Sequence, residues 1–291
     1  MIYSTNTGRI LAPYGKEDIK RGLEMILDAG FPAADISLYD DYGFAIGEER
    51  EEYAALIREC VSSRGATVNQ AHAPFSSYKE YTDSIIPELP RIIEFAAAVG
   101  AKVIVVHPIQ DKPYFSNKEE LFERNIEFYS SLAPYAKKFG IRIGLENMWM
   151  RRPVSNYIDD SIYADPHELA EAYDILSDPE AFTVCLDLGH VALCGRDPSS
   201  AIEILGSRIG ALHVHDVDFV HDSHTLPGQG KIDWDSVCRS LAKIDYKGDF
   251  TLEASCFYQG YPKELWTSAL KFMSEVARYY SERVEEYKKL K

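Results

Sequence analysis

The sequence predicts an α/β fold, a (β/α)8 TIM barrel, for the chain of 291 residues. Three observations support this prediction. Short apolar runs with strand character recur eight times, segments with helical spacing lie between them, and a glycine precedes most of the runs. Strands and helices that alternate at intervals of roughly 25 to 40 residues favour parallel pairing with right-handed crossovers. Eight such units close a barrel.

The eight expected strands follow one another along the whole chain. They are IYST near the N-terminus, ADISLY, ATVNQAH, AKVIVVH, IRIGLE, TVCLD (183–187), ALHVHD and DFTLE. A glycine that ends a helix in the left-handed conformation lets the chain turn back into the next strand. The glycines expected in that role are Gly30, Gly65, Gly100, Gly140, Gly210 and Gly248.

Apolar residues at helical spacing predict the eight helices, over 17–28, 48–64, 84–99, 118–138, 166–176, 199–206, 233–244 and 262–289. Two helix starts have recognisable caps. Asp165, Pro166 and Glu168 suit the N-cap, N1 and N3 positions, and Asp233 is suited to cap the helix that begins at Trp234. Because no linker or low-complexity segment divides the chain, we expect a single domain over 1–291.

Composition and charge narrow the class of protein. With 46% hydrophobic and 26% charged residues, the composition is that of an ordinary globular protein. The net charge of −15 disfavours a nucleic acid or an anionic membrane as partner. No apolar run is long enough to span a bilayer and no signal peptide is recognisable, so a cytoplasmic location is expected. The five scattered cysteines predict buried free thiols, with neither a disulfide framework nor a thiolate zinc site.

Chemically capable residues stand where the expected strands end. In a barrel of this kind the active site lies at the carboxyl ends of the strands, so residues far apart in sequence become neighbours around one rim. His167 and His221 are instead assigned to solvent, and the orientation of His215 stays open because the strand is ending there. The strand-end residues are His72, His107, Glu146, Asp187, His190, His213 and Glu253, and the loop after the seventh strand adds Asp222 and His224.

The two glutamates point to a metal. Glu146 and Glu253 each end an apolar strand, where a lone buried carboxylate costs several kcal/mol unless it is paired or bound to a cation. A divalent cation at the barrel mouth satisfies the carboxylates and imidazoles together. This donor set, without thiolates, favours Zn²⁺, Mn²⁺, Fe²⁺ or Co²⁺ over Ca²⁺, and Mg²⁺ is also compatible.

Seven motifs in chain order resemble the xylose-isomerase-like barrel superfamily. That superfamily includes sugar-phosphate isomerases and epimerases, inosose dehydratases, and DNA-repair enzymes of the endonuclease IV type. The motifs span nearly the whole chain, which makes the resemblance specific. They are AHAPF (71–75), VVHP (105–108), GLEN (144–147), CLDLGH (185–190), HVHD (213–216), DSHTLPGQGKIDW (222–234) and TLEAS (251–255).

The resemblance implies a set of site residues. It makes Glu146, Asp187, His213 and Glu253 the central metal ligands, and it places His190 to touch the substrate. Endonuclease IV binds three metals, and many sugar-isomerase-like relatives keep several of the additional positions too. Whether those residues hold further metals or contact substrate therefore stays open. The additional positions match His72, His107, His190, Asp222 and His224.

Two loops favour a sugar over DNA. The segment 40–52 carries six carboxylates and one arginine, and such a surface repels phosphates. Near Glu146 and Glu253, the chain instead offers aromatic rings with a few donors, which suit a small polyol or sugar. The candidate substrate-binding residues of these loops, besides His190, are Trp149, Arg151, Arg152 and Phe257.

The sequence therefore predicts an enzyme, a divalent-metal-dependent sugar or sugar-phosphate isomerase or epimerase of carbohydrate metabolism. Glu146 and Glu253 would act as proton acceptor and donor around an enediolate. Isomerisation, epimerisation and an inosose-type dehydration all begin with removal of the same α-proton, so they stay unresolved. An endonuclease IV-like phosphodiesterase acting on abasic DNA is the alternative, and a non-catalytic barrel with a structural metal is the third. The oligomeric state is open, a homo-oligomer included.

Overall fold

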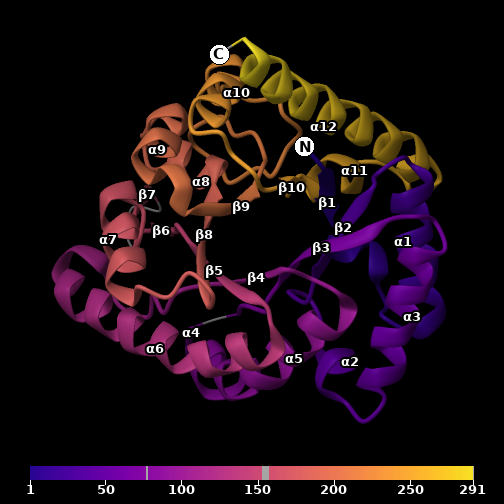
Figure 1. Cartoon of the computed structure of the whole chain (residues 1–291), viewed down its shortest axis with the longest axis horizontal. Coiled ribbons are helices and arrows are strands. Elements are labelled where there is room, and N and C mark those ends of the chain that lie inside the picture. The colour runs from indigo at the N-terminus through magenta and orange to yellow at the C-terminus, as the bar shows by residue number, and fades with distance from the viewer. Residues whose placement is uncertain (77, 153–156, 291) are drawn as a thin grey trace.

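The computed structural model describes residues 1–76, 78–152 and 157–290. Eight parallel strands pair in the order β10-β1-β2-β3-β4-β5-β8-β9. The backbone N–H of Val214 donates to Thr251 O at 2.9 Å and that of Glu253 donates to Val214 O at 2.9 Å, which joins the two outer strands and closes the barrel (Figure 1). The strands are β1 (Tyr3–Asn6), β2 (Ala33–Ser37), β3 (Thr67–His72), β4 (Val103–Val106), β5 (Arg142–Glu146), β8 (Phe182–Asp187), β9 (Ile209–His213) and β10 (Phe250–Leu252).

Helices surround the strands, as the predicted barrel requires (Figure 1). Their inward faces pack on the strands and form the main hydrophobic core. In the described parts of the chain, no helix is both long and apolar enough to cross a membrane. The outer helices are α1 (Lys16–Asp28), α3 (Arg50–Ser62), α5 (Leu89–Val99), α6 (Lys118–Phe139), α7 (Pro166–Leu176), α9 (Pro198–Leu205), α10 (Trp234–Lys243) and α12 (Trp266–Lys289).

The predicted helix caps are confirmed. The side chain of Asp165 accepts from the backbone N–H of His167 at 2.9 Å, and that of Asp233 accepts from Ser236 at 3.2 Å. The helix expected over 84–99 is shorter than predicted, since α5 begins only at Leu89 after a π-helical turn and a 3-10 turn.

Four of the six expected helix-ending glycines have the predicted conformation. Gly30, Gly65, Gly100 and Gly140 all have positive φ, between 66° and 102°. The expectation is wrong for Gly210, which lies inside β9 while Gly206 has the positive φ, and for Gly248, where Asp245 has it. These two glycines are needed for space. A Cβ on Gly210 would lie 2.2 Å from Thr183 Oγ1, and one on Gly248 would lie 2.2 Å from Tyr246 Oη.

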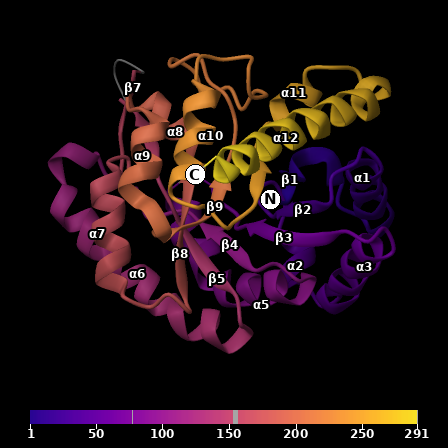
Figure 2. The ribbon, with the colours of Figure 1, turned by 45° about the horizontal axis from the view of Figure 1, so that its top comes forward.

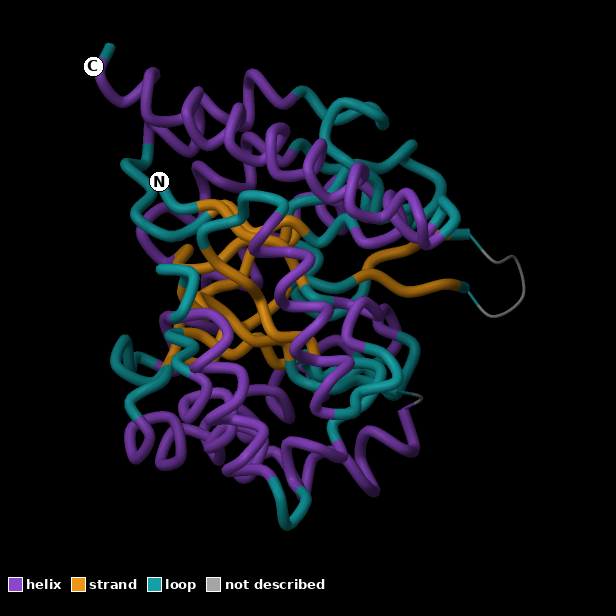
Figure 3. The backbone as a smooth tube through the Cα atoms, turned by 90° about the vertical axis from the view of Figure 1, so that its right-hand side faces the viewer, coloured by secondary structure: helices purple, strands orange, loops and turns teal. Residues whose placement is uncertain are grey.

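Several short elements at the carboxyl ends of the strands are absent from the sequence-based prediction. The antiparallel hairpin β6 (Trp149–Arg151) and β7 (Ile158–Asp160) follows β5 and extends beyond the barrel (Figure 3). Figure 2 shows β7, the loop after β9 and α11 (Ser255–Gln259) at the same end of the molecule, at the top of that view. The other short helices are α2 (Gly43–Ile46), α4 (Tyr78–Glu80) and α8 (Leu188–Leu193).

The inside of the barrel has two unlike halves. Under β4, β5, β8 and β9 it is apolar, with Val103, Val105, Cys185 and Ala211 packed on one another as a cluster separate from the main core. Under β1, β2, β3 and β10 it is polar and hydrogen-bonded. There, Thr251 bonds with Ser4 (3.0 Å) and Asn69 (3.1 Å), and the carboxylate of Asp35 accepts from Asn6 (3.0 Å) and Gln70 (3.4 Å).

Candidate metal centre

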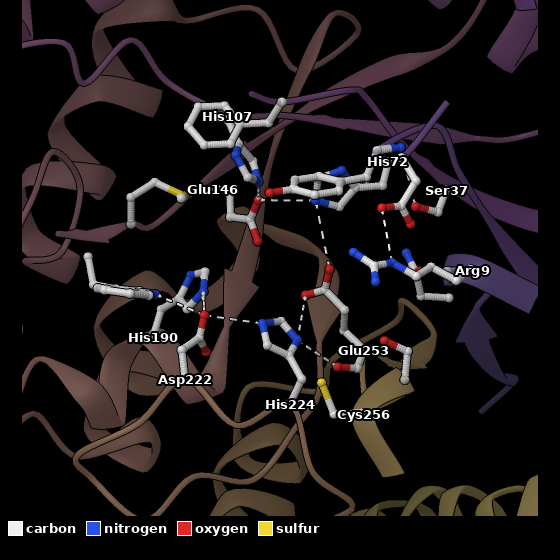
Figure 4. Close-up of a pocket in the computed structure, with 18 of the residues that line it drawn as sticks. Arg9, Ser37, His72, His107, Glu146, His190, Asp222, His224, Glu253 and Cys256 are labelled. Atoms are coloured by element: carbon white, nitrogen blue, oxygen red, sulfur yellow. Dashed lines mark hydrogen bonds and ion pairs between the residues drawn. The ribbon is translucent and has the colours of Figure 1, made fainter. Parts of the chain in front are cut away.

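The residues predicted at the strand ends come together at one end of the barrel, around a cavity of about 640 Å³. Their side chains point toward one another from different strands and loops (Figure 4). Asp187 and His213 lie against the same cluster and are fully buried. The predicted residues that line the cavity itself are His72, His107, Glu146, Trp149, Arg151, His190, Asp222, His224 and Glu253.

The first group of potential ligands is rich in carboxylates. Glu146, Asp187, His213 and Glu253 each offer a donor atom within 4.8 Å of the others. His213 Nδ1 lies 2.5 Å from Glu146 Oε1 and 3.3 Å from Glu253 Oε2. Three carboxylates around one imidazole concentrate negative charge in a buried place. A divalent cation neutralises that charge and fits this donor set.

The second group is rich in histidines and consists of His190, His215, Asp222 and His224. His224 Nε2 lies 3.2 Å from Asp222 Oδ2, and the rings of His215 and His224 stack with centroids 4.1 Å apart. The other carboxylate oxygen of Asp222 is buried and has no hydrogen-bond partner among the described residues. Such an orphaned oxygen beside imidazoles is a position where a cation fits.

A third group shares Glu146 with the first. His107 Nε2 lies 3.0 Å and His72 Nε2 lies 3.8 Å from Glu146 Oε2, and His72 is also 3.9 Å from Glu253 Oε1. All nine positions matched by the superfamily motifs therefore belong to one continuous cluster.

Three histidines are oriented in the same way. In each of them, Nδ1 lies within hydrogen-bond distance of a backbone carbonyl oxygen. The distances are 2.7 Å from His72 to Ala73 O, 2.9 Å from His190 to Asn147 O and 2.8 Å from His224 to Glu253 O. The Nε2 atom of each ring faces a carboxylate of the cluster. An outer contact of this kind fixes the tautomer and the ring orientation of metal-binding histidines.

The electrostatics of the cluster follow from burial and close opposite charges. Burial alone would raise the pKa of Asp187, but His190 and His215 lower it to about 2. Burial alone would lower the pKa of His190, but Asp187 and Asp222 raise it to about 10. The opposite holds for His72, whose pKa falls to about 4 because of burial and the neighbouring His107. The lowered pKa keeps the Asp187 carboxylate ionised, as a metal ligand must be.

Asp187 joins the two main groups. Its carboxylate lies 3.0 and 3.1 Å from His215 Nε2 and accepts from the backbone N–H of His190 at 2.6 Å, as the N-cap of α8. His215, whose orientation the sequence left open, is fully buried and belongs to the histidine-rich group. The available signal was its spacing of two residues from His213, which puts both on one side of an extended chain.

A buried aspartate that the prediction missed shapes the loop carrying Asp222 and His224. The carboxylate of Asp216 accepts four N–H groups at 2.8 to 3.1 Å, three from backbone amides and one from the Trp234 indole. A Cβ on Gly230 would lie 2.3 Å from Asp216 Oδ1, so the loop closes tightly on this carboxylate. The sequence held one signal, an aspartate three residues beyond the strand-end His213.

The expected substrate-binding residues divide into two pairs. Trp149 and Arg151 line the cavity, as does His190. Arg152 lies outside the cavity lining, since its guanidinium pairs with Asp159 and its side chain is 61% exposed. Phe257 also lies outside it, packed against Tyr261 and Phe272 on the side of α12. The part of the first loop at 153–156 falls outside the described residues.

The exposed histidines and the cysteines can be placed as well. His167 and His221 are exposed, as predicted. The five cysteines are free. Cys60, Cys185 and Cys238 are buried as expected and Cys194 is half-buried, but the expectation is wrong for Cys256, which is exposed and lines the cavity. Cys185 is buried beneath the cluster, beside Glu146 and His213.

Comparison with known proteins identifies the class. A family model described as Xylose isomerase-like TIM barrel matches residues 23–276, and the chain belongs to this family, as the motifs indicated. Inosose dehydratase from Bacillus cereus is 27% identical over 242 residues, which cover 73% of this chain and 77% of that protein. The uncharacterized protein y4fM from Sinorhizobium fredii is 25% identical over 265 residues, 81% of each chain.

Solved structures confirm the fold. The crystal structure of a D-tagatose 3-epimerase-like protein matches with a TM-score of 0.74 at 22% identity, covering 98% of this chain and 99% of that one. D-Psicose 3-epimerase from Clostridium cellulolyticum H10 also matches with a TM-score of 0.74, at 16% identity and with 96% and 99% coverage. At these identities the likeness shows a shared architecture, and the reaction has to be argued from the site.

Proposed function

We propose that the protein is a divalent-metal-dependent isomerase or epimerase that removes a proton from the carbon next to the carbonyl of a sugar or sugar-like polyol. One observation carries the proposal: Glu146 and Glu253 reach the same buried cation-binding group from β5 and from the end of β10. The inosose dehydratase among the relatives and the sugar epimerases among the similar structures support it.

Glu146, Asp187, His213 and Glu253 would hold the cation, and Zn²⁺, Mn²⁺, Co²⁺ or Fe²⁺ suit them. When bound, the cation supplies Lewis-acid polarisation of a carbonyl, which makes the neighbouring C–H more acidic. Glu146 is 1% exposed and Glu253 17% exposed at the side chain. Glu253 is therefore the carboxylate more open to the cavity and the first candidate to accept the proton, with Glu146 returning one.

Three other side chains would bind and orient the substrate. His190 and Trp149 stand side by side on the cavity wall, with ring centroids 6.4 Å apart. His190 Nε2 lies at the cavity wall, 3.8 Å from Asp222 Oδ2. A substrate oxygen bound beside this nitrogen would accept a hydrogen bond from it. Arg151 offers a cation at the rim. These contacts would serve isomerisation, epimerisation and dehydration alike.

A proton-exchange experiment tests this function. The metal-loaded protein is incubated in D₂O with a panel of ketoses, ketose phosphates and inososes, and deuterium at the carbon α to the carbonyl is followed by NMR. We expect incorporation into at least one compound and loss of exchange after removal of metal with a chelator. Failure of every compound to take up deuterium would contradict the proposal.

A phosphodiesterase acting on abasic DNA remains the second candidate, because the nine matched positions do assemble and could hold more than one cation. The charge of −15 and the acidic segment 40–52 oppose it, since a DNA-binding face has to neutralise several phosphates. Anomalous scattering would count the metals. Three peaks, together with metal-dependent nicking of an abasic duplex at near-physiological salt, would favour this candidate.

A further inference from the structure

The cavity above the candidate metal centre has walls of different chemistry. One wall follows β3 and β5 and continues into the hairpin. It carries aromatic rings and thioethers, from Phe75, Met148, Trp149 and Met150, beside the amide of Gln110, which accepts from Ser161. The opposite wall comes from β1, β2 and α11 and offers amides and hydroxyls: Asn6, Ser37, Ser255 and Gln259. The metal-binding groups lie between the two walls.

The apolar wall is fixed in place by contacts between side chains of the protein itself. The indole N–H of Trp149 donates to Asp222 Oδ2 at 3.2 Å, and the Arg151 guanidinium lies 5.1 Å from the centroid of the same ring. Arg196 holds the second strand of the hairpin through two hydrogen bonds to Asp160, at 2.6 and 2.7 Å. A wall that is ordered in advance binds an apolar group without the entropic cost of ordering it.

Such a wall discriminates against a substrate with hydroxyls on every side. A hydroxyl that faces Met148, Trp149 and Met150 loses its hydrogen bonds to water and gains none, whereas an apolar group there gains burial. The size of the cavity agrees. Its volume of about 640 Å³ lies within the range of about 300 to 1,000 Å³ of pockets that hold drug-sized ligands, so it has room for a substituent beside one sugar ring.

The arginines that line the cavity are poorly placed to bind a phosphate as the additional group. Four carboxylates line the cavity, from Asp40, Glu146, Asp222 and Glu253, against the guanidinium groups of two arginines. One of these, Arg9, pairs with Asp40 at 3.2 Å, and the other, Arg151, packs on the Trp149 ring. Both guanidinium groups are thus already engaged within the protein, and a phosphate would have to compete with these contacts.

We propose that the substrate is a keto-sugar or keto-polyol that carries a neutral apolar substituent, with its hydroxyls on the polar wall and the substituent against Met148, Trp149 and Met150. This inference rests on the proposed function and adds the class of substrate. The substituent must be attached at a position that leaves the carbonyl of the substrate free, because removal of the α-proton requires a free carbonyl.

Equilibrium binding to the metal-loaded protein tests this preference, and the two glycosides among the probes have no free carbonyl and cannot react. The probes are glucose, methyl β-glucoside, phenyl β-glucoside and glucose 6-phosphate, measured by calorimetry or by quenching of tryptophan fluorescence. We expect phenyl β-glucoside to bind at least about tenfold more tightly than methyl β-glucoside, since the ring buries additional apolar surface. Glucose 6-phosphate is expected to bind no better than glucose.

Two matched variants, one on each wall, show which wall causes the preference for the phenyl group. Met150→Gln keeps the length of the side chain but makes the wall polar, and it should reduce the phenyl preference to less than about threefold. Ser255→Ala on the opposite wall should weaken the binding of the methyl and phenyl glucosides by a similar factor. The ratio of their two affinities should therefore stay unchanged. Thermal unfolding of both variants verifies that they fold.

The preference is rejected if methyl and phenyl glucosides bind within threefold of each other, or if none of the probes binds at millimolar concentration. Tightest binding of glucose 6-phosphate would overturn it in favour of a phosphorylated substrate. These outcomes are separate from failure of the proposed function, which shows as absence of deuterium exchange over the whole sugar panel.

Discussion

The two halves of the barrel interior support the cavity differently. Glu146, Asp187 and His213 stand at the ends of β5, β8 and β9, directly above the apolar cluster of Val103, Val105, Cys185 and Ala211. On the other side, under β1, β2, β3 and β10, hydrogen bonds link serine, threonine, amide and carboxylate side chains. The charged groups above the apolar half have few polar neighbours other than one another. Their attraction for a cation is therefore strong, because few dipoles compete with it.

This comparison teaches where substitutions should act. A charge removed above the apolar half should abolish metal binding, because no neighbouring dipole can replace it. A charge removed in the polar half should change stability and its dependence on pH, because a hydrogen-bonded network remains around it. The following predictions test that division, from the largest expected effect to the smallest.

Asp187→Ala should have the largest effect. It removes the carboxylate shared by the carboxylate-rich and histidine-rich groups. We expect tight binding of the central metal to be lost and exchange activity to fall by at least about a thousandfold. Metal content after dialysis, measured by elemental analysis beside the parent protein, checks this. Equal metal in the two proteins would show that the site is misplaced.

Glu253→Gln tests the proton acceptor. The amide keeps an oxygen for the cation but accepts a proton poorly, so we expect α-proton exchange to fall by about 10² to 10⁴. Metal content should fall much less than in Asp187→Ala. Deuterium incorporation measured at saturating metal separates the two effects, and a variant that exchanges at the parental rate would remove Glu253 from the acceptor role.

Asp216→Asn tests the loop after β9. The amide leaves one acceptor oxygen where the carboxylate accepts four N–H groups, so the loop should hold Asp222 and His224 less firmly. We expect roughly a tenfold loss of metal affinity at the histidine-rich group, as for other outer contacts of metal ligands. Asp218→Asn is the matched control, because its exposed carboxylate caps a turn of the same loop. Similar losses in both variants would argue against a specific role for Asp216.

The sequence predicted the barrel and the gathering of nine residues, at strand ends and in the loop after the seventh strand, for one physical reason: carboxyl ends of parallel strands share a rim. It misplaced side chains where the local element was too short to recognise. Arg151 ends β6 and lines the cavity, whereas Arg152 lies beyond that strand and pairs with Asp159 of β7. In α11, Cys256 and Gln259 are three residues apart and face the cavity together, so Phe257 faces α12 instead.

The acceptor network of Asp216 and the apolar wall were beyond sequence reasoning for a related reason. Each depends on segments that meet only after the barrel has closed. The indole of Trp149 reaches Asp222, which is 73 residues away in the chain, and no periodicity encodes that contact. The buried Asp35 in the polar half is a further case, because its surroundings come from β1 and β3.

The smallest predicted effect concerns Asp35 and is a change of stability with pH. Burial raises the pKa of Asp35 from 3.8 to about 6. An acid with a higher pKa in the folded chain binds its proton more tightly when folded, so its contribution to stability is fully present below about pH 4 and is lost as the pH rises through about 6. Asp35→Asn is neutral at every pH and escapes this loss. Relative to the parent, its free energy of unfolding should therefore increase between pH 4 and 7, by about 3 kcal/mol at most.

Denaturant unfolding at several pH values, with metal removed from both proteins, measures this difference. Asp233→Asn provides a control of opposite sign, because hydrogen bonds from the backbone N–H and the hydroxyl of Ser236 lower the pKa of Asp233. The stability that these bonds give the parent is present above the ordinary pKa of an aspartate and is lost as the pH falls through the lowered value. A difference between Asp35→Asn and the parent that stays constant from pH 4 to 7 would show that Asp35 keeps its charge in the folded barrel. In that case, hydrogen bonds in the polar half would stabilise an ionised, buried carboxylate as effectively as a cation does above the apolar half.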